Sequence, residues 1–522
     1  MLRESEAAEA GSERFNSLSP ISYALKKADD ENLPWVVLTH GSRIRLYATD
    51  VHAGVGRRGR TETYIECQPS LLAEAHLAYL WLLYSAEALT PDGSLRQVME
   101  GSQRFAGDLA ERLRERIYDH VVPELARGIA DARGIERPRP QDLHDTYEMA
   151  LTVLFRLLFI AYAEDRDLLP YRFNDAYRRR SLKQKAQELA NAVATETPIA
   201  SGSAHWQETT LLWEAIAHGN TEWGVPAYNG GLFDSHVAVS PTGAELANFT
   251  LPNERFESAL RHLMVIETSE GVPGPVDFRS LGVREFGTIY EGLLESELAV
   301  AECDLVLKKK KGEIVYAPVS QMKEPDVSAG ETYLHNRSGA RKSSGSYYTK
   351  PFAVEHLLNG ALEPALDDHL NRLNDMDDAN AAKAFFDFRV ADIAMGSGHF
   401  LIGAIDHIEK RMAGYLASRN LPGVRRELAD LKTIAIRELG HLGESTTIED
   451  GQLLRRLIAR RCIYGVDLNK LSVQLGRLAV WIHTFVPGLP LSFLDHNLVQ
   501  GNSLVGIGNL ESPPKTGVMG AS

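Results

Sequence analysis

The chain has 522 residues, more than one hydrophobic core can organise, because single cores stop growing near ~250–300 residues. Its 44% hydrophobic, 24% charged and 8% aromatic residues exclude a disordered or fibrous protein. The net charge of −14 does not by itself favour DNA binding, for which local clusters of Lys and Arg matter more than the sum. No apolar run approaches the ~20 residues that span a membrane, so we expect a cytoplasmic protein of two or three domains.

The first region is predicted to be mixed α/β. From Trp35 to Tyr47 apolar and polar residues alternate on both sides of His40-Gly41-Ser42, which indicates two strands joined by a tight turn. A third strand is predicted over Thr63–Cys67. From Leu71 to about Ala126 the apolar residues recur at intervals of three and four, which predicts helix.

The second region is predicted to be mainly helical. From about Asp142 to Pro170 the sequence predicts a long helix that is apolar nearly all round and therefore buried. Arg284–Leu298 is predicted as an amphipathic helix and 301–318 as a β-hairpin. Asn336–Ser346 lacks apolar periodicity and is predicted as a linker. We therefore predict three domains, over residues 1–130, 131–345 and 346–522.

Several isolated patterns have two interpretations each. The basic runs Lys308–Lys311 and Arg337–Lys342 could contact nucleic acid, or form a solvated hairpin turn and a polar linker. Asp50 with Glu66-Cys67-Gln68 could be a variant magnesium site, or polar residues on strand edges. The three cysteines are far apart and lack metal-ligand spacing, so we assign no metal site.

The last region begins with the pattern of a nucleotide-binding α/β unit. The apolar run Phe388–Ala394 is followed by Met395-Gly396-Ser397-Gly398 and a helix with one apolar face. Glycines allow the backbone to approach a ligand, and the helix N-terminus offers free N–H groups. A dinucleotide fingerprint would need a third glycine where the chain has Leu401, which disfavours NAD.

Two polar residues follow the next predicted strands. Asp467 ends the strand Cys462–Val466, where a carboxylate can accept both ribose hydroxyls of an adenosine or be an ordinary acidic residue near a helix start. Asn502 follows another apolar stretch, and its amide can both donate to and accept from an adenine edge. Asp467 lies 71 residues after Gly396, instead of ~20, which indicates an inserted helical pair.

A helix start precedes these elements, with Thr349 before Pro351, where a hydroxyl and free N–H groups could hold a carboxylate. In chain order, YYTKP, DIAMGSGHF, YGVDLN and GNSL resemble motifs X, I, II and III of DNA adenine-N6 methyltransferases in the γ arrangement. LTHGSRIRLY, LLFIAYAEDRDLLP, YNGGLFD and LGVREFGTIYEGLL further resemble the large single-chain methyltransferases of restriction–modification and related phage-defence systems.

The resemblance implies an α/β fold for nearly the whole chain. Residues 346–522 would form the N-terminal part of a Rossmann-like methyltransferase sheet, preceded by a helical connector (131–345) and a small α/β domain (1–130) that is similar to a nuclease remnant. The implied activity is methylation of adenine N6 in double-stranded DNA with S-adenosylmethionine. Other subunits of a defence system are further candidate partners, and no membrane is involved.

The resemblance also implies a cofactor role for seven residues. Thr349 would contact the methionine carboxylate and Asp392 would lie near the methionine amino group. The remaining five are Gly396, Ser397 and Gly398 around the methionine and ribose, Asp467 at the ribose hydroxyls, and Asn502 at the adenine. Family members usually have Pro and Cys where this chain has Ile393 and Met395.

The family holds the flipped target base with Asn-Pro-Pro-Tyr or Asn-Pro-Pro-Phe, and this tetrapeptide does not occur in the sequence. Ser512-Pro513-Pro514-Lys515 is the nearest match, with Lys in place of the stacking aromatic residue. We therefore expect the front part of a methyltransferase and assign no catalytic residue. The alternatives are a non-catalytic cofactor- or DNA-binding fragment or subunit of a defence complex, and a helical scaffold with an incidental Gly-x-Gly turn.

Overall fold

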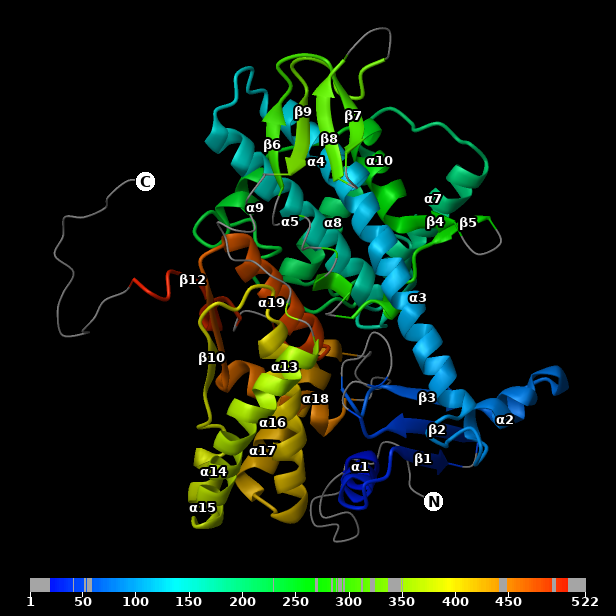
Figure 1. The fold of residues 1–522 in the computed structure, drawn as a ribbon, viewed down its shortest axis with the longest axis vertical. Coiled ribbons are helices and arrows are strands. Elements are labelled where there is room, and N and C mark those ends of the chain that lie inside the picture. Colours follow the sequence, from blue (N-terminus) through cyan, green and yellow to red (C-terminus); the bar gives the residue numbers. More distant parts are fainter. Residues whose placement is uncertain are drawn as a thin grey trace.

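The computed structural model describes residues 19–40, 42–50, 53, 59–228, 230–267, 271–282, 285–287, 289, 293, 296–310, 313–319, 324–336, 349, 351–440, 448–490 and 494–505. These residues form a mixed α/β fold with several small sheets. Figure 1 shows a small N-terminal sheet beside the helices of the C-terminal region, with the mainly helical middle region above both.

The strands predicted in the first region are confirmed. The sheet has the antiparallel order β1-β2-β3, and α1 packs against β1. The helix predicted from Leu71 is instead broken into shorter pieces, because Pro91-Asp92-Gly93 is a turn sequence. The elements are α1 (Pro20–Asp30), β1 (Trp35–His40), β2 (Arg43–Ala48), β3 (Tyr64–Cys67), the 3-10 turns η2 (Pro69–Leu71) and η3 (Glu74–His76), and α2 (Ala78–Tyr84).

Two long helices of the described chain each contain a π turn next to a proline. In the first, α3 (Ser94–Arg116), η4 (Ile117–Val121) and α4 (Val122–Arg133) follow without a break, with Pro123 just after the π turn. In the second, α13 (Pro351–Leu357), η7 (Leu358–Leu362) and α14 (Glu363–Asn374) do the same, with Pro364 in the equivalent place. Proline cannot donate to the carbonyl four residues earlier, so the helix widens there.

The helix predicted near Asp142 is confirmed as α5 (Pro140–Asp165). It is long and apolar enough to span a membrane, but 94% of its apolar window is buried inside the protein. Helices from the middle region cover it, and so does α19 from the C-terminal region, where the rings of Phe159 and Trp481 stack with centroids 3.6 Å apart. The middle and C-terminal regions therefore share one hydrophobic core.

The rest of the middle region surrounds α5. The predicted hairpin is confirmed as β7 and β8, with residues 311–312 outside the described part. The helix predicted over Arg284–Leu298 is wrong at its end, because Ser296–Val300 is a strand that pairs with β9. The elements are α6 (Asp175–Arg178), α7 (Leu182–Ala194), α8 (Ala204–His218), α9 (Pro241–Leu246), α10 (Asn253–Met264), β4 (Val265–Glu267), β5 (Pro273–Pro275), η5 (Phe278–Ser280), β6 (Ser296–Val300), β7 (Leu305–Lys310), β8 (Glu313–Pro318) and β9 (Thr332–Asn336).

The C-terminal region contains a parallel sheet in the order β10-β11-β12. Several helices connect β10 to β11, as the long spacing between the predicted strands indicates. The predicted linker over 337–346 lies outside the described residues, and the three predicted domain ranges remain predictions. The elements are α15 (Asp378–Ala384), β10 (Val390–Asp392), α16 (His399–Ser418), α17 (Pro422–Leu439), α18 (Asp450–Arg461), β11 (Ile463–Asp467), α19 (Lys470–Thr484), α20 (Leu494–Asn497) and β12 (Leu498–Gln500).

A buried ion pair joins the N-terminal and C-terminal regions. The guanidinium of Arg455, in α18, lies 2.8 Å from a carboxylate oxygen of Glu62, and their side chains are 1% and 9% exposed. A Cβ on Gly59 would lie 1.7 Å from Arg455 Nη2, so the turn before β3 closes directly over the guanidinium. Burial lowers the pKa of Arg455, but Glu62, Glu409 and Asp406 outweigh it and raise the pKa above its usual value.

We predict that Glu62→Ala lowers the free energy of unfolding by about 3–5 kcal/mol, because it leaves the guanidinium buried without its nearest carboxylate. Urea denaturation of the purified chain measures the change. The variant Glu62→Ala/Arg455→Met, which removes both charges, should recover most of the loss.

The matched control is Glu427→Ala, which removes the partner of Arg461 on the same helix. That pair is 2.9 Å apart and more than 40% exposed on both sides, so the expected loss is below about 1 kcal/mol. Equal losses for the two single variants would contradict the interpretation that burial makes the Glu62–Arg455 pair important.

Candidate functional site

The three parallel strands β10, β11 and β12 end at the same edge of their sheet. Asp392 is the last residue of β10, Asp467 is the last residue of β11, and Gly501-Asn502 follows β12. The N–H of Gly501 donates to the carbonyl of Asp467 at 2.9 Å. The structure therefore brings together polar residues that are far apart in the sequence.

The side chain of Asp467 fastens this edge. One carboxylate oxygen accepts the N–H of Gly396 at 2.9 Å, and the other accepts the N–H of Asn469 at 2.8 Å. The turn after β10 is thus tied to the start of α19. Each carboxylate oxygen has a second lone pair, so Asp467 can still accept hydrogen bonds from two hydroxyl groups.

The Gly-x-Gly turn has the backbone shape that glycine permits. Gly396 has φ = 53° and Gly398 has φ = 85°, both in the left-handed region. A Cβ on Gly398 would lie 3.3 Å from the Cα of Gly476 in α19, so the turn packs closely on that helix. A Cβ on Gly396 would meet no atom within 4 Å. The space beside Gly396 is open, which a bound molecule needs.

Two carboxylates make this edge acidic. Burial raises the pKa of Asp392, the N–H of Ala394 lowers it through a 3.1 Å hydrogen bond, and nearby Asp467 raises it again. The repulsion between Asp392 and Asp467 would be relieved by a cationic group placed between them.

Contacts missed by the sequence analysis support the turn. Met395, which occupies the position of the family's Cys, is buried, and a Cβ on Gly465 would lie 2.2 Å from its sulfur. The hydroxyl of Ser397 lies 3.0 Å from Nδ1 of His399. A Cβ on Gly287 would lie 2.5 Å from the His399 ring, so the middle region reaches the Gly-x-Gly turn. In the sequence, only the glycines at 465, within a predicted strand, and 287, within a predicted helix, indicate that other groups approach the backbone closely here.

Asn502 and Thr349 make fewer contacts with the sheet edge than the other candidate residues do. The side-chain oxygen of Asn502 accepts the N–H groups of Leu504 and Val505 at 3.0 and 3.1 Å, which leaves its amide nitrogen exposed. Thr349 is half-buried just before α13, with no contact to the sheet edge among the described residues, and residues 347, 348 and 350 of its motif lie outside that part. Phe352, near the start of α13, is 72% exposed.

Apolar side chains also surround this edge. Ile393 and Leu468, which directly follow Asp392 and Asp467, are 58% and 66% exposed. Leu504 is exposed as well, two residues after Asn502. Exposed apolar groups beside polar ones suit a ligand that has both a flat ring and hydroxyl groups.

A separate cavity of about 390 Å³ lies between the glycine-rich turn 228–234 and α19. Aromatic rings line much of it, and its cations are neutralised, since Lys470 pairs with Glu148 at 2.7 Å and Arg477 pairs with Asp495 at 3.0 Å. It touches the sheet only through Gln500. We therefore assign this cavity to the packing of two regions and not to the candidate site.

The structure explains Glu66, one of the residues of the alternative magnesium site, by an ion pair. Glu66 accepts a hydrogen bond from Arg45 at 2.7 Å, so its carboxylate is engaged by a guanidinium. Partial burial raises the pKa of Glu66, but the bond from Arg45 lowers it overall. Within the described residues, no three His, Cys, Asp or Glu side chains are grouped to hold a metal ion.

Comparison with known proteins gives a distant similarity. The chain is 22% identical over 413 residues to a protein of Methanocaldococcus jannaschii named "Putative type II restriction enzyme and methyltransferase". The aligned part covers 71% of this chain and 28% of the length of that relative. No protein-family model and no solved structure matches the chain. The similarity supports a relationship to restriction–modification proteins.

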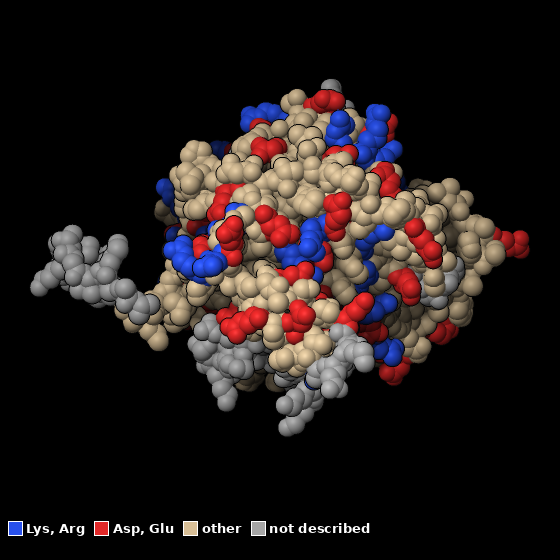
Figure 2. All heavy atoms as spheres, turned by 90° about the horizontal axis from the view of Figure 1, so that it is seen from above, with Lys and Arg blue, Asp and Glu red and all other residues tan. Residues whose placement is uncertain are grey.

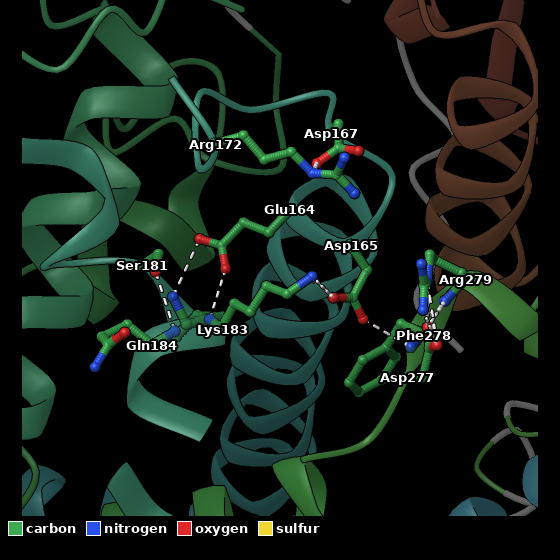
Figure 3. A network of polar contacts seen from close by, with 11 residues as sticks. Glu164, Asp165, Asp167, Arg172, Ser181, Lys183, Gln184, Asp277, Phe278 and Arg279 are labelled. Carbon is green, nitrogen blue, oxygen red and sulfur yellow. Dashed lines mark hydrogen bonds and ion pairs between the residues drawn. The ribbon is translucent and has the colours of Figure 1, made fainter. Parts of the chain in front are cut away.

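The motif AEDRDLLP contains a second group of carboxylates, at the end of α5 (Figure 3). Glu164 is fully buried and accepts three hydrogen bonds, from the N–H groups of Leu182 and Lys183 at 3.1 and 2.7 Å and from the hydroxyl of Tyr177 at 2.8 Å. The carboxylate therefore satisfies N–H groups at the first turn of α7. Its role is structural, since all three donors belong to the protein.

Asp165 fastens the opposite side of the same helix end. One of its oxygens lies 2.7 Å from Nζ of Lys183, and the other accepts the N–H of Phe278 at 2.8 Å. Figure 3 shows Glu164 directed toward the start of α7 and Asp165 directed toward the 277–279 turn. The two consecutive acids thus hold two separate segments against α5.

The protonation of Glu164 couples this contact to pH. Burial raises its pKa to about 7, although its three donors lower it. In the unfolded chain the pKa is about 4.3, so the folded protein binds this proton more tightly. The stability that the tighter binding of this proton adds to the folded protein is complete below about pH 4.3 and is lost as the pH rises to about 7.

We predict that Glu164→Gln lowers the free energy of unfolding by about 1–3 kcal/mol at pH 5, because an amide nitrogen cannot accept the N–H of Lys183. Since glutamine does not titrate, the difference from the natural chain should narrow between pH 5 and pH 8. Urea denaturation at both pH values measures it.

Glu188→Gln is the control, because Glu188 lies on the exposed face of α7. It should change stability by less than about 0.5 kcal/mol at either pH. A difference for Glu164→Gln that widens as the pH rises would contradict the assigned direction of the pKa shift.

Proposed function

We propose that this chain binds S-adenosylmethionine at the carboxyl edge of the β10-β11-β12 sheet and belongs to a restriction–modification enzyme that methylates adenine N6 in DNA. The observation that carries the proposal is the fastening of the Gly-x-Gly turn to Asp467, at the edge where Asp392 and Asn502 also lie. The name of the distant relative supports the reaction class. The choice of adenine rests on the resemblance of the four motifs.

The chain's residues fit the parts of this cofactor. Asp467 has lone pairs left for the two ribose hydroxyls, and Leu468 and Ile393 offer apolar surface for the adenine ring. The open space beside Gly396 accommodates the methionine part. The first turn of α16 presents N–H groups that suit a carboxylate. We infer that Thr349 and Ser397 complete the methionine end.

When bound, S-adenosylmethionine supplies a methyl group on a positively charged sulfonium. Asp392 and Asp467 give the edge a negative potential, which favours a cationic cofactor over the neutral sulfide that remains after transfer. These two carboxylates thereby favour exchange of the spent cofactor. The tie between Asp467 and Gly396 holds the turn in place, so that little rearrangement accompanies binding.

We predict that the purified chain binds S-adenosylmethionine in isothermal titration calorimetry, and that Gly396→Ala weakens binding by at least about tenfold. The added methyl group would enter the open space of the ligand, and φ = 53° costs alanine about 1–2 kcal/mol of stability.

Gly414→Ala is the matched control, because a Cβ at this position of α16 would also meet no atom within 4 Å. It should leave the affinity unchanged, and, as a glycine replaced within a helix, should stabilise the protein slightly. Failure of the natural chain to bind the cofactor, or equal binding by Gly396→Ala, would refute the proposed pocket.

The reaction itself is tested by methyl transfer. Double-stranded DNA is incubated with the chain and cofactor labelled in the methyl group, and the DNA is digested to nucleosides. Label in N6-methyladenine would support adenine as the target base, and label in a cytosine derivative would contradict it. Cofactor binding without any transfer would favour the second candidate, a cofactor-binding fragment or subunit.

A further inference from the structure

A hollow in the middle region gathers positive charge from two helices. It has a volume of about 580 Å³ and lies between the α3–η4 helix, α10, and the β4–β5 hairpin. Cationic and apolar side chains line it together with one carboxylate, that of Glu267. The lining residues are the cationic or titratable Arg112, Arg116, His120, Arg261 and His262, and the apolar Val193, Val265, Ile266 and Pro273.

The first helix contributes three cationic or titratable side chains to the hollow. Arg112, Arg116 and His120 are spaced four residues apart, so they lie on one side of the helix, and all three line the hollow. His120 lies inside η4, where the N–H of Val122 donates to the carbonyl of Ile117, five residues earlier.

The second helix completes the cluster. The guanidinium of Arg116 donates to the carbonyl of Arg261 at 3.4 Å, so α3 and α10 meet at this point. The rings of His120 and His262 stack with centroids 4.2 Å apart and an angle of 19°. Two imidazoles and three guanidiniums thus line one concave surface, which is a costly arrangement unless a counter-charge is available.

Most of this charge has no carboxylate partner among the described residues. Arg261 pairs with Glu257 at 2.7 Å, but Arg116 is bonded to main-chain carbonyls and Arg112 to the carbonyl of Asp108. Glu267 is the only acid that lines the described hollow. On the face shown in Figure 2, by contrast, Lys and Arg are interspersed with Asp and Glu.

Two pKa shifts agree with this excess of positive charge. Burial lowers the pKa of Arg116, and Arg112 lowers it further, while Glu267 raises it. Burial, His120 and Arg116 together lower the pKa of His262 to about 4. His262 is therefore neutral near pH 7, mainly because of its burial, and an anion in the hollow would favour its protonation.

We propose that this hollow binds the phosphate group of a nucleotide or of a nucleic-acid backbone. Guanidinium groups match phosphate oxygens with two parallel hydrogen bonds, and imidazole N–H groups add further donors. The apolar side chains suit the sugar or base attached to the phosphate. None of the residues belongs to the sheet edge proposed for S-adenosylmethionine, so this inference does not depend on that function.

The test uses the variant Arg112→Gln/Arg116→Gln and three probes: inorganic phosphate, AMP and a 20-base-pair DNA duplex. Calorimetry with the natural chain should detect binding, and the double variant should lose at least about tenfold in affinity. Arg114→Gln is the control, since it removes one charge from the same helix at a residue that pairs with Glu111. Its affinity should be unchanged.

Proton uptake provides a second readout. Phosphate binding at pH 6 should protonate His262, so the binding heat should differ between two buffers of different ionisation enthalpy. His262→Gln should abolish much of that difference while its melting temperature stays close to that of the natural chain. Other charged groups that face His262, namely Arg116 and His120 from the first helix, Arg261 on α10 and Glu267 on β4, are unchanged in this variant.

The probes distinguish the two sources of phosphate. Binding of AMP and inorganic phosphate supports a nucleotide site, and binding of the duplex alone, weakened by salt and by the double variant, supports a contact to DNA backbone. Failure of all three probes to bind overturns the proposal. So does binding that the double variant retains in full, because the phosphate would then lie elsewhere on the protein.

Discussion

Helix α5 is apolar around nearly its whole circumference, and such a helix is stable in water only if other elements cover every side. The described structure meets this constraint by packing α4, α7, α9, β6 and α19 around it. Several of its buried polar groups have partners, as in the bond from Arg156 to the carbonyl of Leu232 and the bonds to Glu164. The connections between the middle and C-terminal regions follow from the need to cover α5.

Because α19 belongs to this covering layer, the candidate site depends on it. Asn469, the N-cap of α19, donates its N–H to Asp467. In the middle of α19, Gly476 packs against the Gly-x-Gly turn. Farther along, Trp481 stacks on Phe159 of α5. The open space at Gly396 is therefore positioned by a helix whose own place is set by the hydrophobic core.

The sequence predicted best what depends on neighbouring residues. The hairpins, the helix α5 and the strands before Gly396 and Asp467 have local patterns, and parallel strands end at a common edge, so the meeting of Asp392 and Asp467 could be foreseen. Ser296–Val300 was misassigned because pairing with β9, far along the chain, overrides its helical pattern. The contact of Gly287 with His399 and the burial of the Arg455–Glu62 pair join residues far apart in the chain, so no local sequence pattern indicates them. The binding roles of the seven candidate residues remain predictions.

The N-terminal sheet is attached to the rest of the protein at several places, one of which is the contact of α1 with α16. Through α3, a helix of 23 residues and thus roughly 34 Å long, it is continuous with α4 in the middle region, as Figure 1 shows. Through Glu62 it also docks on α18. The hydrophobic core, α3, the N-terminal sheet and the Glu62–Arg455 ion pair are therefore connected in a closed loop. One residue added to α3 would rotate the sheet by about 100° and shift it by about 1.5 Å, away from its place on α18. Related chains should vary in length within their surface loops, while the number of residues in α3 stays constant.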